Sequence, residues 1–172
     1  MKYKSNPDRI TNVEAAASNL SLAQVAWVVK DITAAERFFK ETLGISIGTI
    51  ETSKASDYNG TYYGKPSDAE NLVAHGYSGG AYIELIQPVS GNSIFRDYLK
   101  KNPAGGIQHL AYTTSAEELD RVIAQFEAKG FREVSSFDTS VAKIVFFDTS
   151  REIGVMTEIL GLTKEGQRVF KR

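Results

Sequence analysis

The fold is decided by the stretch QVAWVVKDITAAERFFKETLGI, residues 24–45. Its opening run of apolar residues suits a strand, and Thr33 with Glu36 has the spacing of a capping box at a helix start. The residues that then recur with the period of a helix are Ala35, Phe38, Phe39, Thr42 and Leu43. Gly44 can adopt the left-handed conformation that ends a helix. The stretch therefore predicts a strand followed by an amphipathic helix.

The same pattern returns in HLAYTTSAEELDRVIAQFEAKGF, residues 109–131. Ser115 and Glu118 have the capping-box spacing, and Gly130 stands where the second helix would end. The helical stripe is formed by Leu119, Val122, Ile123 and Phe126. Because the start signal, the period and the stop signal agree in both places, we expect two copies of one structural module.

Three strand candidates follow each predicted helix, separated by segments rich in turn-forming residues. They are residues 45–52, 71–77 and 81–87 after the first helix, and 131–137, 142–148 and 154–160 after the second. The order β-α-β-β-β is therefore repeated. We divide the chain into an N-terminal extension (1–20), a first module (21–88), a linker with a short helix (89–106), a second module (107–162) and a basic C-terminal tail (163–172), which is expected to be solvated.

The composition excludes several classes of protein. The chain has 172 residues and no cysteine, which excludes disulfide scaffolds, thiolate zinc sites and cysteine nucleophiles. With 20 basic and 21 acidic residues, it lacks the basic surplus typical of nucleic-acid-binding proteins. No apolar stretch approaches the roughly 20 residues of a membrane-spanning helix, and the polar start MKYKSNPDRI is unlike a secretory signal. We expect a cytoplasmic protein whose partners include neither nucleic acid nor membrane.

Alternation of side chains along the strands places polar residues on the face turned away from the helices. In the first strand the bulky Trp27 suits the face that a helix covers, which leaves Gln24 on the open face. In the matching strand Tyr112 takes the covered face, which leaves His109 on the open one. The two modules therefore present polar side chains at equivalent places.

Each module also carries a glutamate in the middle of its last, mainly apolar strand, Glu84 in YIELI and Glu158 in VMTEIL. A carboxylate in such a place is costly unless it is paired or binds a metal. Taken singly, either glutamate could be an edge-strand charge, and His109 alone would suit a structural role. The repeat-related placement of all these residues, together with Gln24, favours a shared site.

These features resemble the vicinal oxygen chelate superfamily, which includes glyoxalase I, methylmalonyl-CoA epimerase, extradiol dioxygenases and bleomycin-resistance proteins. The resemblance covers about residues 22–162, and IELIQPVSGNSIFRDYLKKNPAGGIQHLAY is particularly similar to the epimerase branch. It implies an α+β fold in which two tandem βαβββ modules form one curved mixed sheet with helices on the outer face. It also implies a homodimer and a small-molecule substrate with two vicinal oxygens.

In this superfamily, the first and last strands of each module supply the ligands of one divalent metal ion. The resemblance therefore implies a metal ion bound by Gln24, Glu84, His109 and Glu158. This set is similar to that of mammalian-type glyoxalase I, whereas the epimerases usually have histidine at the position of Gln24. Oxygen and imidazole ligands suit Zn, Ni, Co, Mn or Mg, and the ligand types do not choose among these metals.

The resemblance further implies a metal-dependent isomerase, epimerase or lyase that abstracts a proton next to a metal-bound carbonyl. By resemblance to glyoxalase I, Glu158 is expected to be the base, with Glu84 as its partner on the other side. Epimerases use a further carboxylate of the first module, and Asp68 or Glu70 stands near that place in the sequence. His75, on an inner strand, is a candidate for lining the substrate pocket, and a purely structural role in the strand is the alternative.

Several activities stay open at this point. Within the proton-abstracting class, the linker favours a methylmalonyl-CoA-epimerase-like reaction, and Gln24 favours a glyoxalase-I-like one. A non-catalytic small-molecule binding or resistance protein is the alternative, although resistance proteins of this fold generally lack such a ligand set. An extradiol-type dioxygenase is a further alternative, but its Fe(II) site needs two histidines and one carboxylate, and Gln24 replaces the first histidine.

Overall fold

The computed structural model describes residues 20–170, so nearly all of the predicted N-terminal extension and residues 171–172 lie outside the described part. The strands are β1 (Ser21–Val28), β2 (Glu51–Lys54), β3 (Thr61–Tyr62), β4 (Lys65–Pro66), β5 (Glu70–Ser78), β6 (Ala81–Ser90), β7 (Gly106–Ser115), β8 (Glu133–Asp138), β9 (Ala142–Phe147) and β10 (Met156–Leu162). The helices are α1 (Ile32–Glu41), η2 (Ala55–Tyr58), α2 (Ile94–Lys101), α3 (Leu119–Ala128), α4 (Ser150–Ile153) and α5 (Lys164–Phe170). Among residues 20–170, none of the helices is long and apolar enough to cross a membrane.

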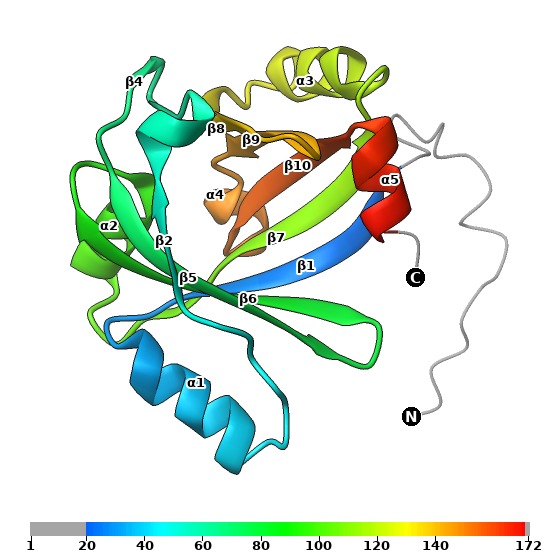
Figure 1. Cartoon of the computed structure of the whole chain (residues 1–172). Helices are drawn as coiled ribbons and strands as arrows, with labels where there is room; N and C mark the ends of the chain where they lie inside the picture. Colours follow the sequence, from blue (N-terminus) through cyan, green and yellow to red (C-terminus); the bar gives the residue numbers. More distant parts are fainter. Residues whose placement is uncertain (1–19, 171–172) are drawn as a thin grey trace, which may run out of the picture.

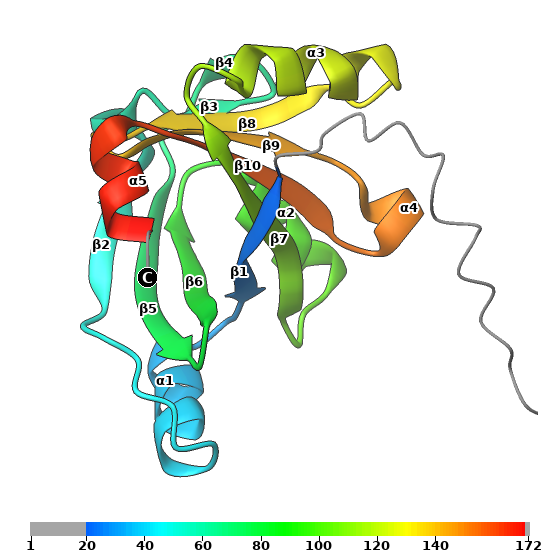
Figure 2. The same ribbon diagram turned by 90° about the vertical axis from the view of Figure 1, so that its right-hand side faces the viewer.

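Within the described residues, ten strands form one mixed sheet in the order β2-β5-β6-β1-β7-β10-β9-β8-β3-β4. β1 and β7 pair antiparallel at its centre, and each also pairs in parallel with a later strand, β1 with β6 and β7 with β10. The sheet curls strongly, and α1 and α3 lie outside the curve (Figure 1, Figure 2). The predicted α+β fold with a curved mixed sheet and outer helices is therefore confirmed.

Both long helices lie where the sequence predicts them, but neither uses its predicted capping box. The side chain of Asp31 caps α1 by accepting a hydrogen bond from the backbone N–H of Ala34 at 2.9 Å. Because Asp31 occupies the N-cap position, Thr33 falls inside the helix. Before α3, Ser115 still belongs to β7, and Glu118 at the N-cap position makes no capping hydrogen bond through its side chain. Both predicted capping boxes were wrong.

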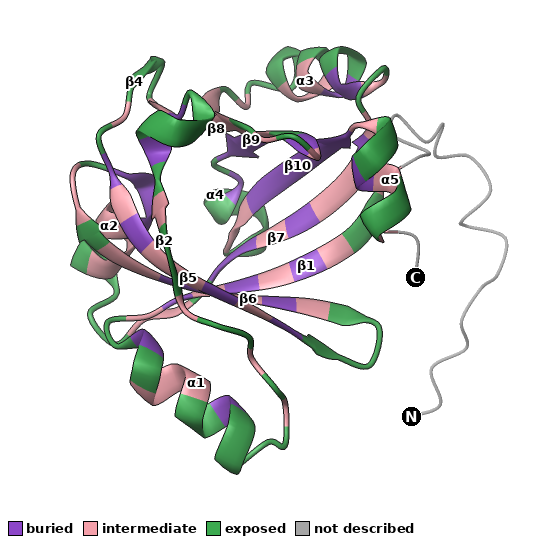
Figure 3. Ribbon diagram, viewed as in Figure 1, coloured by how far each residue is buried: buried purple, intermediate pink, exposed green. Residues whose placement is uncertain are grey.

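The outer layer of the core lies between the sheet and these two helices. Around α1 the buried residues are Ile32, Phe39, Ala74, Ile83 and Leu85, and around α3 they are Leu119, Val122, Val145, Phe147 and Ile159. Burying one large apolar side chain contributes about 1.5–3 kcal/mol, so these stripes hold each helix on the sheet while its other side stays exposed (Figure 3). The α1 stripe is narrower than predicted, because Phe38 and Leu43 are 53% and 50% exposed.

Two further helices contribute apolar side chains to clusters on the inner face of the sheet. Ile94 and Phe95 of α2 join a buried cluster with Val28, Ile86, Val134 and Phe146. Phe170 of α5 packs on a cluster that contains Ala111 and Leu160. Residues 164–170 therefore form a helix that packs through Gly166 and Phe170, while the charged residues Lys164, Glu165 and Arg168 stay exposed. Gly166 allows this packing, because it lies against the backbone of Val141 too closely for a side chain.

The segment between β2 and β5, residues 55–69, crosses from one end of the sheet to the other, and we call it the strap. Its strand β3 pairs antiparallel with β8, with Thr61 opposite Ser136. Tyr62 in the same strand donates a hydrogen bond to Asp97 of α2 at 2.5 Å. Sequence patterns indicated only a turn-rich loop here, yet the strap links the two modules around the inner face of the sheet.

The strand predicted at residues 45–52 is shorter and lies later, at Glu51–Lys54. Ile45, Ile47 and Ile50 pack against the α1 cluster, which explains the apolar pattern. Before β2, one isolated bridge joins Ile47 to Gly76 of β5. A Cβ on Gly76 would lie 2.5 Å from the backbone oxygen of Ser46, so this close approach requires glycine. The prediction was wrong because these apolar side chains anchor an irregular segment.

Candidate active site

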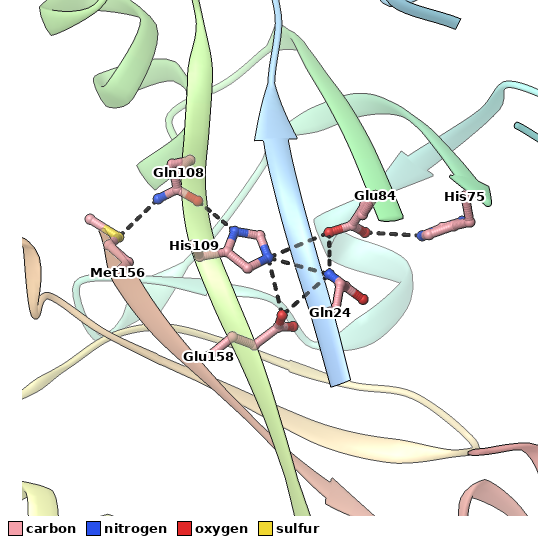
Figure 4. A network of polar contacts seen from close by, with 7 residues as sticks. All are labelled: Gln24, His75, Glu84, Gln108, His109, Met156 and Glu158. Atoms are coloured by element: carbon pink, nitrogen blue, oxygen red, sulfur yellow. Dashed lines mark hydrogen bonds and ion pairs between the residues drawn. The ribbon is translucent and has the colours of Figure 1, made fainter. Parts of the chain in front are cut away.

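Neighbouring strands at the centre of the sheet carry the predicted ligands. Gln24 lies on β1, Glu84 on β6, His109 on β7 and Glu158 on β10. The register places them at two neighbouring levels. Ala26 lies opposite both Glu84 and His109, and Ala111 lies opposite both Gln24 and Glu158. All these side chains point toward one another (Figure 4). His109 is fully buried, while Gln24 and Glu158 are 6% and 4% exposed.

One polar atom from each side chain meets the others at a common centre. Gln24 Nε2 lies 2.8 Å from Glu84 Oε2, 3.4 Å from His109 Nε2 and 3.5 Å from Glu158 Oε2. His109 Nε2 lies 3.1 Å from Glu158 Oε2 and 3.5 Å from Glu84 Oε2. The structure thus brings together every residue that the sequence proposed as a metal ligand.

This donor set fits a divalent metal ion in spacing and chemistry. Two ligands at right angles, each about 2.0–2.2 Å from a metal ion, are about 3 Å apart, and the distances of 2.8–3.5 Å scatter around that value. Rotating the Gln24 amide brings its oxygen to the same centre. The side chains are closed on one another by hydrogen bonds, and no three His, Asp or Glu residues among residues 20–170 form a preformed metal cage. Small rotations are therefore needed to admit an ion.

The charges of the centre are strongly coupled. Burial lowers the pKa of His109, but the neighbouring carboxylates of Glu158 and Glu84 outweigh burial and raise that pKa to about 9. Burial raises the pKa of Glu84, but hydrogen bonds from His109 and His75 outweigh it and lower that pKa to about 2. Burial also raises the pKa of Glu158, and here burial outweighs the opposing effect of His109. Glu158 is therefore the carboxyl group of this centre that most readily takes up a proton.

A cavity of about 240 Å³ lies beside the centre on the inner face of the sheet. Glu84 and Glu158 line it next to the centre, and its apolar lining comes from Val73, Ile86, Phe95, Phe137, Ile144 and Phe146. Tyr58 brings the strap to the same cavity. A small ligand in this cavity would lie between the polar centre and an apolar wall. Small-molecule sites usually combine a mainly apolar lining with a few polar groups in this way.

The weaker predictions for substrate binding have different outcomes. His75 lines the cavity, and its Nε2 lies 3.0 Å from Glu84 Oε1. Asp68 is exposed and accepts a hydrogen bond from the backbone N–H of Asn92. Glu70 forms an ion pair with Lys54 at 3.0 Å. Neither Asp68 nor Glu70 lines the cavity beside the centre.

Glu51 is the carboxylate of the first module that the sequence reasoning missed. It lies on β2, lines the cavity and helps to raise the pKa of His75. In the sheet it stands opposite Val73, two residues before His75. Counting back along the chain from Glu84 could not find Glu51, because the strap inserts residues 55–69 between β2 and β5.

Comparison with known proteins gives matches of two kinds. A model of the family described as "Glyoxalase/Bleomycin resistance protein/Dioxygenase superfamily" matches residues 23–147. An ethylmalonyl-CoA/methylmalonyl-CoA epimerase from Cereibacter sphaeroides is 30% identical over 91 residues, which cover 53% of this chain and 58% of that enzyme. The chain thus matches little more than half of the length of this relative.

Solved structures share the fold at low sequence identity. A hypothetical protein from Bacillus halodurans has a TM-score of 0.63 at 18% identity, covering 84% of this chain and 96% of its own. The methylmalonyl-CoA epimerase of Mycobacterium tuberculosis has a TM-score of 0.60 at 21% identity, with 87% and 91% covered. A variant of the Streptomyces coelicolor epimerase in complex with 2-nitronate-propionyl-CoA has a TM-score of 0.59 at 20% identity, with 86% and 97% covered.

Proposed function

The chain belongs to the glyoxalase/bleomycin resistance protein/dioxygenase superfamily, and we propose that it is a metal-dependent epimerase or closely related isomerase. Such an enzyme removes the proton from a carbon next to a carbonyl group and returns it. The convergence of Gln24, Glu84, His109 and Glu158 beside a mainly apolar cavity is the observation that carries this proposal. A divalent ion held by these side chains would act as a Lewis acid toward two neighbouring substrate oxygens.

The substrate that we propose is a 2-carboxyacyl thioester of coenzyme A. The similarity to an ethylmalonyl-CoA/methylmalonyl-CoA epimerase supports this class. A cavity of about 240 Å³ is smaller than the roughly 300–1,000 Å³ of a site for a drug-sized ligand. It therefore suits the acyl group alone, and the remainder of such a thioester extends beyond it.

Proton transfer is assigned to carboxylates at the cavity. Glu158 is the proposed base, because burial raises its pKa and makes it a better proton acceptor than an ordinary carboxylate. Epimerisation also needs a group that returns a proton to the other face of the same carbon. Glu51 serves this role better than the predicted Glu84, since both carboxylate oxygens of Glu84 already contact His75 and Gln24.

Deuterium exchange tests the proposed reaction and its need for Glu158, as ligand or as base, directly. Racemic methylmalonyl-CoA or ethylmalonyl-CoA is incubated in D₂O with the protein and each divalent metal, and deuterium at C2 is followed by mass spectrometry. We expect metal-dependent exchange that falls roughly 100-fold or more in Glu158→Gln. The control is Glu127→Gln, which changes an exposed glutamate on α3. Equal exchange by wild type and Glu158→Gln contradicts the assignment.

A glyoxalase-type reaction is the second candidate, and Gln24 favours it, because the resemblance implies this ligand for glyoxalase I. The same preparations are given the hemithioacetal of methylglyoxal and glutathione, and formation of the thioester is followed by absorbance. Turnover of the hemithioacetal without exchange of the CoA thioesters would move the proposal to this reaction. Binding of both ligands without turnover would favour a non-catalytic binding protein.

A homodimer and a cytoplasmic location also remain part of the proposal. Light scattering of the purified protein tests the first, because the chain has a mass of 18.9 kDa and a dimer has twice that mass.

A further inference from the structure

A β-bulge in β7 lies directly next to His109. Ala26 of β1 stands opposite His109, whereas the next residue, Trp27, stands opposite Ile107. Gln108 is therefore the extra residue in the antiparallel pairing of β1 with β7. Bulges change the direction of a side chain and occur often beside active sites. Instead of pointing to the face opposite His109, the side chain of Gln108 lies beside the imidazole ring (Figure 4).

The contacts of Gln108 determine which way its amide group faces. Gln108 Nε2 donates a hydrogen bond to Met156 Sδ at 2.9 Å, and Gln108 Oε1 lies 2.6 Å from His109 Nδ1. A thioether sulfur can accept a hydrogen bond but has no hydrogen to donate. The NH₂ group of the amide must therefore face Met156, which leaves the amide oxygen facing the ring. An amide oxygen only accepts, so Nδ1 of His109 carries the hydrogen.

We propose that Gln108, oriented by Met156, is a positioning residue that fixes the Nδ1–H tautomer of His109 and directs its Nε2 to the metal. This inference rests on the proposed function, since it assigns Nε2 as the ligand atom. Nε2 lies 3.1 Å from Glu158 and 3.5 Å from Glu84, at the centre described above. Metal-bound histidines generally donate their other ring N–H to such a partner, and losing that partner weakens binding.

The surroundings of the ring support this role. Phe146 and Phe95 pack on His109 with ring centroids 5.1 and 6.1 Å away. These rings hold the imidazole by contact but offer no oxygen atom to Nδ1. Gln108 itself is only 1% exposed. The ring is therefore packed by hydrocarbon on its sides, and the buried amide of Gln108 is the hydrogen-bond partner at its Nδ1.

The choice of variant follows from a second cavity, of about 200 Å³, which Gln108 and Met156 line together with Asp97 and Asp148. In Gln108→Ala a water molecule from this cavity could replace the amide oxygen. Gln108→Met avoids this, because it keeps the length of the side chain and removes the acceptor. Gln108→Glu restores an acceptor oxygen and serves as the rescue.

The matched control is Gln87→Met. The Gln87 side chain accepts a hydrogen bond from the backbone N–H of Ile32 at 2.8 Å, so this variant also loses a structural amide contact. Gln87 lies on β6, three residues after Glu84, and its side-chain hydrogen bond goes to the start of α1 and not to the ring of His109. A fall in Zn²⁺ affinity shared by Gln108→Met and Gln87→Met would reflect lower stability of the fold. A fall confined to Gln108→Met would reflect loss of ring positioning.

Nitrogen NMR detects the tautomer of His109 directly. The spectrum is simple to assign, because the chain has only two histidines. Protein labelled with ¹⁵N-histidine is recorded with and without one equivalent of Zn²⁺, and His75→Asn identifies the signals of His109. We expect a protected Nδ1–H and a metal-bound Nε2 in wild type, in Gln87→Met and in Gln108→Glu. In Gln108→Met the protection of Nδ1–H is lost, and Zn²⁺ affinity by chelator competition falls about 10- to 100-fold.

The inference is overturned if Gln108→Met keeps the protected Nδ1–H and the Zn²⁺ affinity of wild type. It is also overturned if Gln108→Glu fails to restore them while remaining folded by circular dichroism. Failure of the proposed function looks different, because wild type itself would then bind no Zn²⁺. In that case metal-free spectra recorded above pH 9, where the ring is neutral, still decide whether Gln108 fixes the Nδ1–H tautomer.

Discussion

At the scale of single residues, the charge of His109 links the metal site to stability. Its pKa in the folded protein is raised from 6.5 to about 9 by Glu158 and Glu84. A raised pKa stabilises the folded state below the unfolded value, and this contribution is lost as pH rises through the folded value. The metal-free protein is therefore expected to lose stability between about pH 6.5 and pH 9.

Urea denaturation at pH 6.5 and pH 9.5 measures this effect. The denaturation midpoint of metal-free wild type should fall, whereas His109→Gln, which cannot take up the proton, should show a smaller fall. Saturation with Zn²⁺ should also reduce the effect, because a bound ion replaces the proton on the imidazole. The same fall in His109→Gln as in wild type would contradict the role of this proton.

Most of the candidate ligands were predictable because strand alternation is a local rule. Gln24 and His109 follow it, and Glu84 and Glu158 stand out as charges within apolar strands. Gln108 was missed because a bulge breaks the alternation, and the sequence alone carries no sign of that bulge. Its role becomes visible only when the register of β1 against β7 is known.

At the scale of elements, the start of α1 gives a test of the corrected cap. Asp31→Ala removes the side chain that caps the helix and should lower the free energy of unfolding by about 1 kcal/mol. Thr33→Ala changes the residue of the predicted capping box and should leave stability nearly unchanged, since alanine suits a helix interior. Urea denaturation of both variants measures the free energy of unfolding. A larger loss of stability in Thr33→Ala than in Asp31→Ala would favour the predicted capping box over the Asp31 cap.

The two long helices α1 and α3 were predictable because each one carries its own period and end signal. The strap was not, because β3 and β4 each consist of two residues, and β3 pairs with β8, far along the chain. The packing of α5 was equally hidden, since a charged sequence gave no sign that Gly166 lies against the backbone of Val141. Local patterns found the elements that stand alone and missed those that depend on distant partners.

At the scale of the whole molecule, the curled sheet sets the size of the cavity, and Phe137 is one of its apolar walls. Phe137→Ala should enlarge the cavity and raise kcat/KM for 2-carboxyacyl thioesters with longer side chains, relative to methylmalonyl-CoA. The control is Phe126→Ala, because Phe126 is also partly buried but packs in the outer α3 cluster. Competition between short and long substrates measures this ratio. An equal change in both variants would exclude Phe137 as a determinant of size.

The two-module architecture followed from one repeated pattern, because two copies of β-α-β-β-β can bury their apolar faces together as a single sheet. The cavity did not follow from the sequence. Its lining joins Glu51 of β2 with Thr139 and Phe146 of the second module, and no local pattern relates these residues. The position of a site could therefore be predicted, while the size of its cavity and the presence of Glu51 required the structure.

The metal content of freshly purified protein shows whether Gln24, Glu84, His109 and Glu158 hold a metal ion, with wild type measured beside His109→Ala and Glu158→Gln. Removing one ligand of a buried site should abolish tight binding. We expect about one divalent ion per chain in wild type and its loss in both variants, with folding checked by circular dichroism. A metal-free wild type that gains no stability from added Zn, Ni, Co, Mn or Mg would contradict it.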